Sequence, residues 1–266
     1  MTADIKQQFD SSPEAVLRQI ALLREDSTKG DETLALINRA INTAHDYVIT
    51  LLNERFLEYQ HRVMDLIAKP EEEKTDSIMR SSLETMREAA LDMQEYAAEN
   101  SLTRWESRVY RNLGRVADYS GNYAEAIEYY SQAIDTAGED PEVKEKGVPR
   151  QLELQAFMYF STIKSGKVKE GTDKSRKLYE AFEISPEGKK LREMDYATWA
   201  IWRTGIVYRT VNALLDAQSS ALRMDEMKMW VMDSEKLLYP PPDVKVWVDF
   251  SYRKTEFENT KMRLGI

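Results

Sequence analysis

Four arginines at helical spacing are the most distinctive chemical feature of this sequence. Arg104, Arg108, Arg111 and Arg115 follow one another at steps of four, three and four residues, so a helix would carry all four on one face. A guanidinium group can bind a carboxylate or a phosphate through two parallel hydrogen bonds. The pattern therefore indicates either a binding site for an acidic ligand or a set of ion pairs inside the protein.

The second interpretation needs acidic residues within reach of the arginines. Candidates lie in the segments just before and just after them, at Glu95, Glu99 and Glu153. In that case the arginines would join neighbouring helices, and no ligand would be needed to explain them. Both interpretations are compatible with the sequence.

No residue pattern in the chain predicts catalysis or a metal site. The chain has two histidines, His45 and His61, and no cysteine. It contains no His-Glu zinc motif, no glycine-rich phosphate loop and no nucleophile elbow. We therefore expect no enzyme activity, no metal and no cofactor.

The overall charge and hydrophobicity exclude two classes of partner. A formal net charge of −9 disfavours nucleic acid, because nucleic-acid binding requires a basic surface. No run of about 18 uncharged apolar residues is present, so we expect no membrane insertion. The first residues lack the apolar core of a signal peptide, and a chain without cysteine suits a reducing compartment, so a cytoplasmic protein is expected.

Apolar residues recur every three or four positions along most of the chain, which is typical of helices with one buried face. Only 10 glycines and 8 prolines occur in the 266 residues. The breaks between the periodic segments predict about five helical hairpins, at residues 12–45, 47–99, 103–139, 146–184 and 187–239. The predicted fold class is therefore all-α, with residues 1–266 in a single domain.

The segment 105–141 resembles a tetratricopeptide repeat, a helix pair of about 34 residues with aromatic, small and turn residues at fixed positions. The matching residues are Tyr110, Leu113, Gly114, Gly121, Tyr123, Ala126, Tyr130, Ala133 and Pro141. Ala117 departs from the pattern, which usually has an aromatic residue there, and Pro141 comes late. The resemblance implies a right-handed α-solenoid, in which stacked hairpins leave a long concave groove.

The next segment carries a weaker copy of the same pattern. Gly166 lies 45 residues after Gly121, and Pro186 lies 45 residues after Pro141. Gly171 then takes the place of Ala126. A conserved distance between turn residues predicts that residues 151–186 repeat the architecture of the preceding hairpin.

In this family the first helix of each repeat lines the groove. The resemblance therefore implies a peptide-binding role for Arg108, Arg111, Asn112, Arg115 and Tyr119. Phe157 and Phe160 would add an apolar part of the groove, or would instead belong to the core between helices. Some family members hold a C-terminal carboxylate with a clamp of Lys and Asn residues, but apart from Asn112 that clamp is absent here.

The resemblance thus implies a non-enzymatic scaffold that binds a protein or peptide, and the arginines favour a partner with an acidic or C-terminal carboxylate segment. The alternative is a helical domain that senses a small ligand or a signalling peptide, which would require a closed, deep pocket. The sequence predicts no particular oligomeric state.

A last segment, residues 243–264, is expected to cap the end of the solenoid as a helix. Val244 to Phe250 alternate between apolar and polar residues, which would also suit a strand. We prefer a helix, because a lone strand in an all-helical protein has no partner strand.

Overall fold

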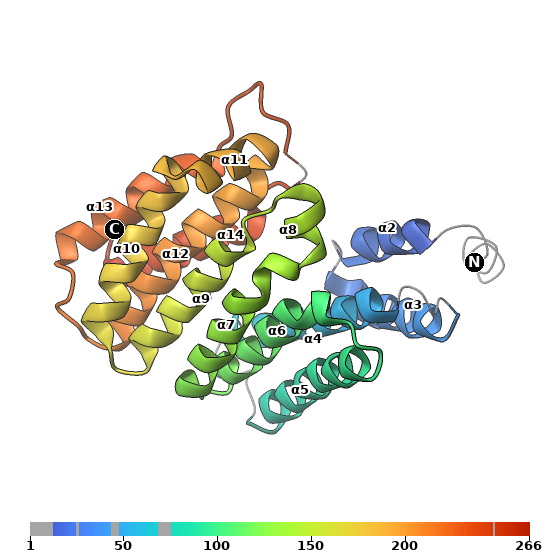
Figure 1. Cartoon of the computed structure of the whole chain (residues 1–266). Coiled ribbons are helices and arrows are strands. Elements are labelled where there is room, and N and C mark those ends of the chain that lie inside the picture. Colours follow the sequence, from blue (N-terminus) through green and yellow to red (C-terminus); the bar gives the residue numbers. More distant parts are fainter. Residues whose placement is uncertain (1–12, 25–26, 44–47, 69–75, 247) are drawn as a thin grey trace. The chain divides into compact units, whose positions relative to one another are not determined.

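The computed structural model describes residues 13–24, 27–43, 48–68, 76–246 and 248–266 (Figure 1). The described residues form α-helices and short 3-10 helices and contain no strand, which confirms the all-α prediction. His45 and the predicted hairpin ends at residues 12, 45 and 47 lie outside them. The chain divides into two compact units, Met1–Ser120 and Gly121–Ile266.

The first unit is a series of helices in which each one packs against the next. Its α-helices are α2 (Pro13–Arg24), α3 (Gly30–Thr43), α4 (Val48–Ala68), α5 (Asp76–Glu99) and α6 (Glu106–Tyr119), with short 3-10 turns η1 (Ser27–Lys29) and η4 (Thr103–Trp105). Ile20, Ile37 and Leu51 form an apolar centre for the first three helices. Neighbours in the chain are thus also neighbours in space, as in helical bundles.

Ion pairs join the first three helices of this unit around a buried acid. Arg24 Nη1 lies 2.7 Å from Glu54 Oε2, and Arg62 Nη2 lies 3.1 Å from Asp31 Oδ1. Glu58 is buried between the two arginines, 3.8 Å from Arg24 and 3.5 Å from Arg62. A carboxylate that is removed from water needs such partners, because burial of an unpaired charge is costly.

The second unit is built around one long helix. Its α-helices are α7 (Tyr123–Thr136), α8 (Pro141–Lys146), α9 (Arg150–Lys164), α10 (Val168–Ile184), α11 (Pro186–Met194), α12 (Tyr196–Asp216), α13 (Met224–Glu235) and α14 (Ser251–Leu264), with 3-10 turns η5 (Ala137–Glu139) and η6 (Lys236–Leu238). Helix α12 contacts α9, α10, α11, α13 and α14. Most of its residues are buried, as expected of a central helix.

Arginines on aromatic rings are a recurrent feature of this unit. The Arg203 guanidinium lies 4.3 Å from the Tyr179 ring and 5.1 Å from the Trp199 ring, and it pairs with Glu183. Arg150 lies 5.5 Å from the Trp202 ring and pairs with Glu142 and Glu153. Burial alone would lower the pKa of Arg150, but the two carboxylates raise it above its usual value.

The two segments with the 45-residue spacing have the same order of elements along the chain. Gly121 separates α6 from α7 with φ of 77°, and Gly166 separates α9 from α10 with φ of 94°, a region that favours glycine. In each segment the second helix is followed by a short helix with proline at its first turn, capped by Asp140 before α8 and by Ser185 before α11. The turn residues and the proline thus occupy equivalent places in both segments.

The structure differs from the prediction at the end of the chain. The terminal helix α14 begins at Ser251 and not at residue 244, and the described part of 244–250 has no regular secondary structure. Val244, Val246 and Val248 are half-buried against the core of the second unit, whereas Lys245 and Asp249 are exposed. The apolar-polar alternation therefore comes from an extended segment that packs one side on the core without a partner strand.

Candidate functional site

The arginine-bearing helix α6 is buried over most of its surface. Its buried residues include the apolar Val109, Leu113 and Val116, and also the polar Asn112, Arg115 and Asp118. Arg104, in the turn before α6, is exposed, whereas Arg108, Arg111 and Tyr119 are half-buried. The four arginines therefore lie in different environments, although their spacing places them on one helical face.

Asn112 anchors one part of this face to the interior of the first unit. Its Nδ2 donates to Asn53 Oδ1 of α4 at 3.1 Å and lies 3.4 Å from the Met93 sulfur of α5. Its own Oδ1 accepts from Arg111 Nη1 at 3.3 Å. A fully buried amide thus fixes the guanidinium group of Arg111, which is only half-buried.

Arg115 has the same relation to Tyr119 one turn further along α6. Arg115 Nη1 lies 3.3 Å from Asp118 Oδ2, and another of its nitrogens donates to the Tyr119 hydroxyl. The guanidinium also lies 4.5 Å from the Tyr119 ring. Both Arg115 and Asp118 are buried, so Arg115 holds Tyr119 in place and is itself removed from solvent.

Arg108 packs on Trp105, the residue that precedes α6. Its guanidinium lies 4.8 Å from the ring of Trp105, which is 7% exposed. A cation over an indole face is held by the quadrupole of the ring. This contact orients Arg108 without placing it in the core.

The three acids considered as partners of these arginines lie in different surroundings. Within the described part of the chain, Glu95 and Glu99 are exposed and form no ion pair with an arginine. Glu153 lies 2.7 Å from Arg150 Nη1. Arg115 pairs with Asp118 of its own helix, at a spacing of three residues that the sequence reasoning did not consider.

The two phenylalanines proposed for the groove lie in the second unit. Phe157 is 5% exposed and stacks on Tyr130 of α7, with 5.6 Å between the ring centroids. The guanidinium of Arg209 from α12 lies 4.6 Å from the same ring. Phe157 therefore packs between helices, whereas Phe160 is half-buried.

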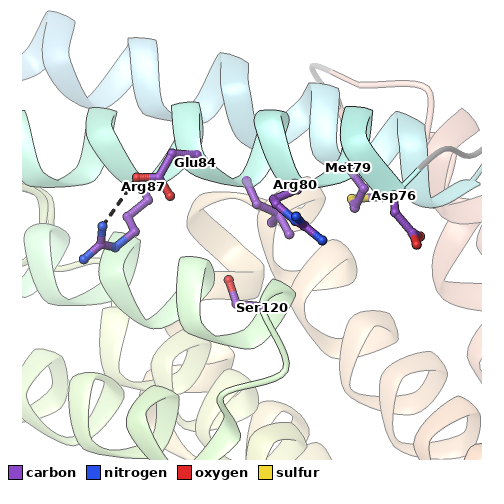
Figure 2. Close-up of a pocket in the computed structure, with 7 residues that line it drawn as sticks. Asp76, Met79, Arg80, Glu84, Arg87 and Ser120 are labelled. Atoms are coloured by element: carbon purple, nitrogen blue, oxygen red, sulfur yellow. Dashed lines mark ion pairs between the residues drawn. The ribbon is translucent and has the colours of Figure 1, made fainter.

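A surface hollow beside α5 was not foreseen. It measures about 390 Å³ and is lined by Asp76, Met79, Arg80, Leu83, Glu84, Arg87 and Ser120. Figure 2 shows these side chains along one side of α5, with Ser120 at the end of α6 facing them. Glu84 and Arg87 form an ion pair at 3.5 Å. Most of the lining residues are exposed, so the hollow is open to solvent and its charges are balanced.

Sequence reasoning missed this hollow because Met79 and Leu83 continue the apolar stripe of α5. The buried residues of that stripe begin only at Met86. The charges Arg80, Glu84 and Arg87, spaced four and three residues apart beside the stripe, were the available signal for an exposed first half of the helix.

The described residues contain no group of three or more acidic or histidine side chains arranged to hold a metal ion. None of their helices is both long and apolar enough to cross a membrane. The α6 face carries guanidinium and phenol groups, which are hydrogen-bond donors suited to an acceptor such as a carboxylate.

Residues 107–140 match the family model described as tetratricopeptide repeat. The match begins at the second residue of α6, covers α7 and ends at the residue that caps α8. This chain therefore contains a tetratricopeptide repeat at the position where the residue pattern indicated one. None of the curated proteins compared with the chain matches it.

Proposed function

We propose that this protein is a non-enzymatic scaffold that binds an acidic peptide segment or a free C-terminal carboxylate at the basic face of α6. The observation that carries the proposal is the repeat match at residues 107–140, since repeats of this kind are built to present a binding surface. The first helix of the matched repeat is the helix that carries the arginines.

The contacts within α6 support a division of roles among the proposed residues. Arg108, Arg111 and Tyr119 are half-buried and would meet the peptide. Asn112 and Arg115 are buried and would act as positioning residues, because Asn112 holds Arg111 and Arg115 holds Tyr119. Donors that are held in place before binding lose less conformational entropy when the ligand arrives.

The two phenylalanines of the second unit have different roles in the proposal. Phe160 is half-buried and would offer apolar contact to a peptide. Phe157 would serve only to support the helices, because its ring is already covered by Tyr130 and Arg209. The ligand-sensing alternative receives less support. Small-molecule sites are normally concave and enclose most of the ligand, whereas the hollow beside α5 is open to solvent.

The test compares two double variants that remove the same charge from neighbouring helices. Arg108→Ala with Arg111→Ala alters the proposed site, and Arg80→Ala with Arg87→Ala alters the exposed arginines of α5. Peptides that bind the unaltered chain are selected from a random library. Half of its members have a free C-terminus and half have an amidated one. Their affinity for each variant is then measured by fluorescence anisotropy.

We expect the α6 variant to bind the selected peptides at least about tenfold more weakly, because a hydrogen bond to a charged group contributes about 1.5–3 kcal/mol. The α5 variant should bind as the unaltered chain does, and added salt should weaken binding to the unaltered chain. Equal affinity of both double variants for the peptides would contradict the proposal. Arg115→Ala serves as a further control and should lower the melting temperature, since it removes the partner 3.3 Å from Asp118.

A further inference from the structure

The outer face of α13 carries apolar residues that the core of the second unit does not use. Met227, Val231 and Ser234 face the core and are buried. On the opposite side, Met229 is 59% exposed and Met232 is 44% exposed. A helix in an outer position normally has a polar face toward solvent, so this pair of methionines indicates a surface that is covered by a partner.

Two charged residues extend the methionine pair into a stripe. Asp225, Met229, Met232 and Lys236 follow one another at steps of four, three and four residues, and rotation of 100° per residue places them on one side of the helix. The side chains of Asp225 and Lys236 are 64% and 73% exposed. Lys236 begins the 3-10 turn that continues α13 directly. We call these four residues the α13 stripe.

The α13 stripe is complementary to itself when it is reversed. If a second α13 runs antiparallel, with the two-fold axis between Met229 and Met232, each Met229 faces the other Met232. The same axis places Asp225 of each chain opposite Lys236 of the other. Lys228 and Asp233, which flank the stripe, also become opposed with opposite charge. Such a surface suits an isologous contact, in which the same residues serve on both sides.

We propose that the α13 stripe is an interface through which two copies of this chain associate as an antiparallel helix pair. The order of charges favours a second copy of this chain as the partner. The order acid, methionine, methionine, base is complementary to its own reverse. The existing local ion pairs do not oppose this. Asp225 lies 3.3 Å from Arg223, and Lys236 lies 3.9 Å from Asp233, and exposed pairs of this kind are weak and easily rearranged.

The size of the surface sets the strength of the association. A stripe on one helix buries less area than the roughly 1,200–2,000 Å² of a typical stable complex. The dimer is therefore weak and concentration-dependent, with a dissociation constant on the order of tens to hundreds of micromolar. The inference is independent of the peptide-binding proposal, because α13 and α6 belong to different units.

Sedimentation equilibrium of the full chain from about 1 to about 500 micromolar is the first test. We expect a shift from monomer toward dimer across this range. Met229→Glu with Met232→Glu should weaken the association at least about tenfold, because it places four carboxylates in the contact. Met224→Glu is the matched control: Met224 is also an exposed methionine of α13, but it lies about 110° away from the centre of the stripe. Circular dichroism melting checks that each variant is folded.

Charge reversal tests the antiparallel register itself. Asp225→Lys places lysine opposite lysine, and Lys236→Asp places aspartate opposite aspartate, so each single variant should associate several-fold more weakly. A mixture of the two single variants should form a heterodimer, and the chain with both changes should associate as the unaltered chain does. A strictly monomeric unaltered chain, an unaffected methionine double variant, or a mixture without heterodimers would each overturn the proposal.

Discussion

Gly171 shows at the scale of one residue how closely two helices of the second unit approach. A Cβ atom placed on Gly171 would lie 2.6 Å from Ile163 Cγ1 and 2.8 Å from the backbone nitrogen of Ile163. Because atoms cannot approach this closely, an alanine at this position would force the backbone or the side chain of a neighbour to shift. Gly171→Ala should therefore lower the free energy of unfolding by about 1–3 kcal/mol, although alanine favours the helix itself by about 1 kcal/mol. Urea denaturation followed by circular dichroism measures the change.

Gly138→Ala is the matched control for this prediction. Gly138 lies in η5, its φ is not in the left-handed region, and no atom lies within 4 Å of its added Cβ. It should leave the unfolding free energy nearly unchanged. If both glycine substitutions had the same effect, then α9 and α10 would not pack as closely as Gly171 requires.

The sequence could identify the residues of the α6 face but not their exposure. The steps of four, three and four place Arg108, Arg111 and Arg115 on one side of a helix, and that inference is purely local. Whether a side of a helix is open depends on how many other segments pack around it. Arg115 is buried, and its guanidinium contacts Asp118 and Tyr119, at spacings of three and four residues, a pairing that the helical repeat allows but does not require.

At the scale of elements, Tyr208 provides a pH-dependent link between α12 and α13. Its hydroxyl accepts from Ser234 Oγ at 3.1 Å, and its side chain is fully buried. Burial raises the pKa of Tyr208 to about 12, from an ordinary value near 10. An unfolded chain therefore releases this proton at a lower pH than the folded chain does.

The sign of the effect follows from that order of pKa values. The contribution of Tyr208 to the free energy of unfolding is fully present below a pH of about 10. It is lost as the pH rises toward about 12, by up to about 3 kcal/mol for a pKa difference of about two units. Tyr208→Phe cannot ionise, so its unfolding free energy should decline less steeply over this range. Urea denaturation of both chains at a series of alkaline pH values measures the two slopes, and parallel slopes would exclude Tyr208 as the cause.

Long elements were predictable from the sequence, whereas short ones were not. The apolar period of three to four residues located the long helices, because a buried face must repeat at that spacing. Helices α8 and α11 are too short to show such a period, although Asp140-Pro141 and Ser185-Pro186 are recognisable start signals. The segment before α14 was assigned to a helix because a lone strand would have no partner, although its alternation also suits an irregular segment that packs one side on a core.

At the scale of the whole molecule, the boundary between the two units could not be read from the sequence. It falls at Gly121, within the segment that matches the repeat family. Repeat patterns report how a helix pair is built, whereas a unit boundary depends on contacts among all the helices. The fold class and the repeat were therefore predictable, and the division of the chain was not.

The arginines on aromatic rings in the second unit have a consequence for the choice of denaturant. Arg150 on Trp202 and Arg203 on Tyr179 are contacts of a guanidinium group, and guanidinium chloride supplies the same group at molar concentration. It competes for the ring faces, and its ionic strength also screens the carboxylate partners. Urea is uncharged and leaves the ion pairs intact.

The unfolding free energy extrapolated from guanidinium chloride should therefore lie about 1–2 kcal/mol below the value from urea. The difference should narrow in Arg203→Leu, which removes one cation from two rings at once. Identical values from the two denaturants would show that these contacts contribute little. A stability measured for this protein in a single denaturant thus includes the chemistry of that denaturant, and the difference between two of them measures how strongly the rings hold their cations.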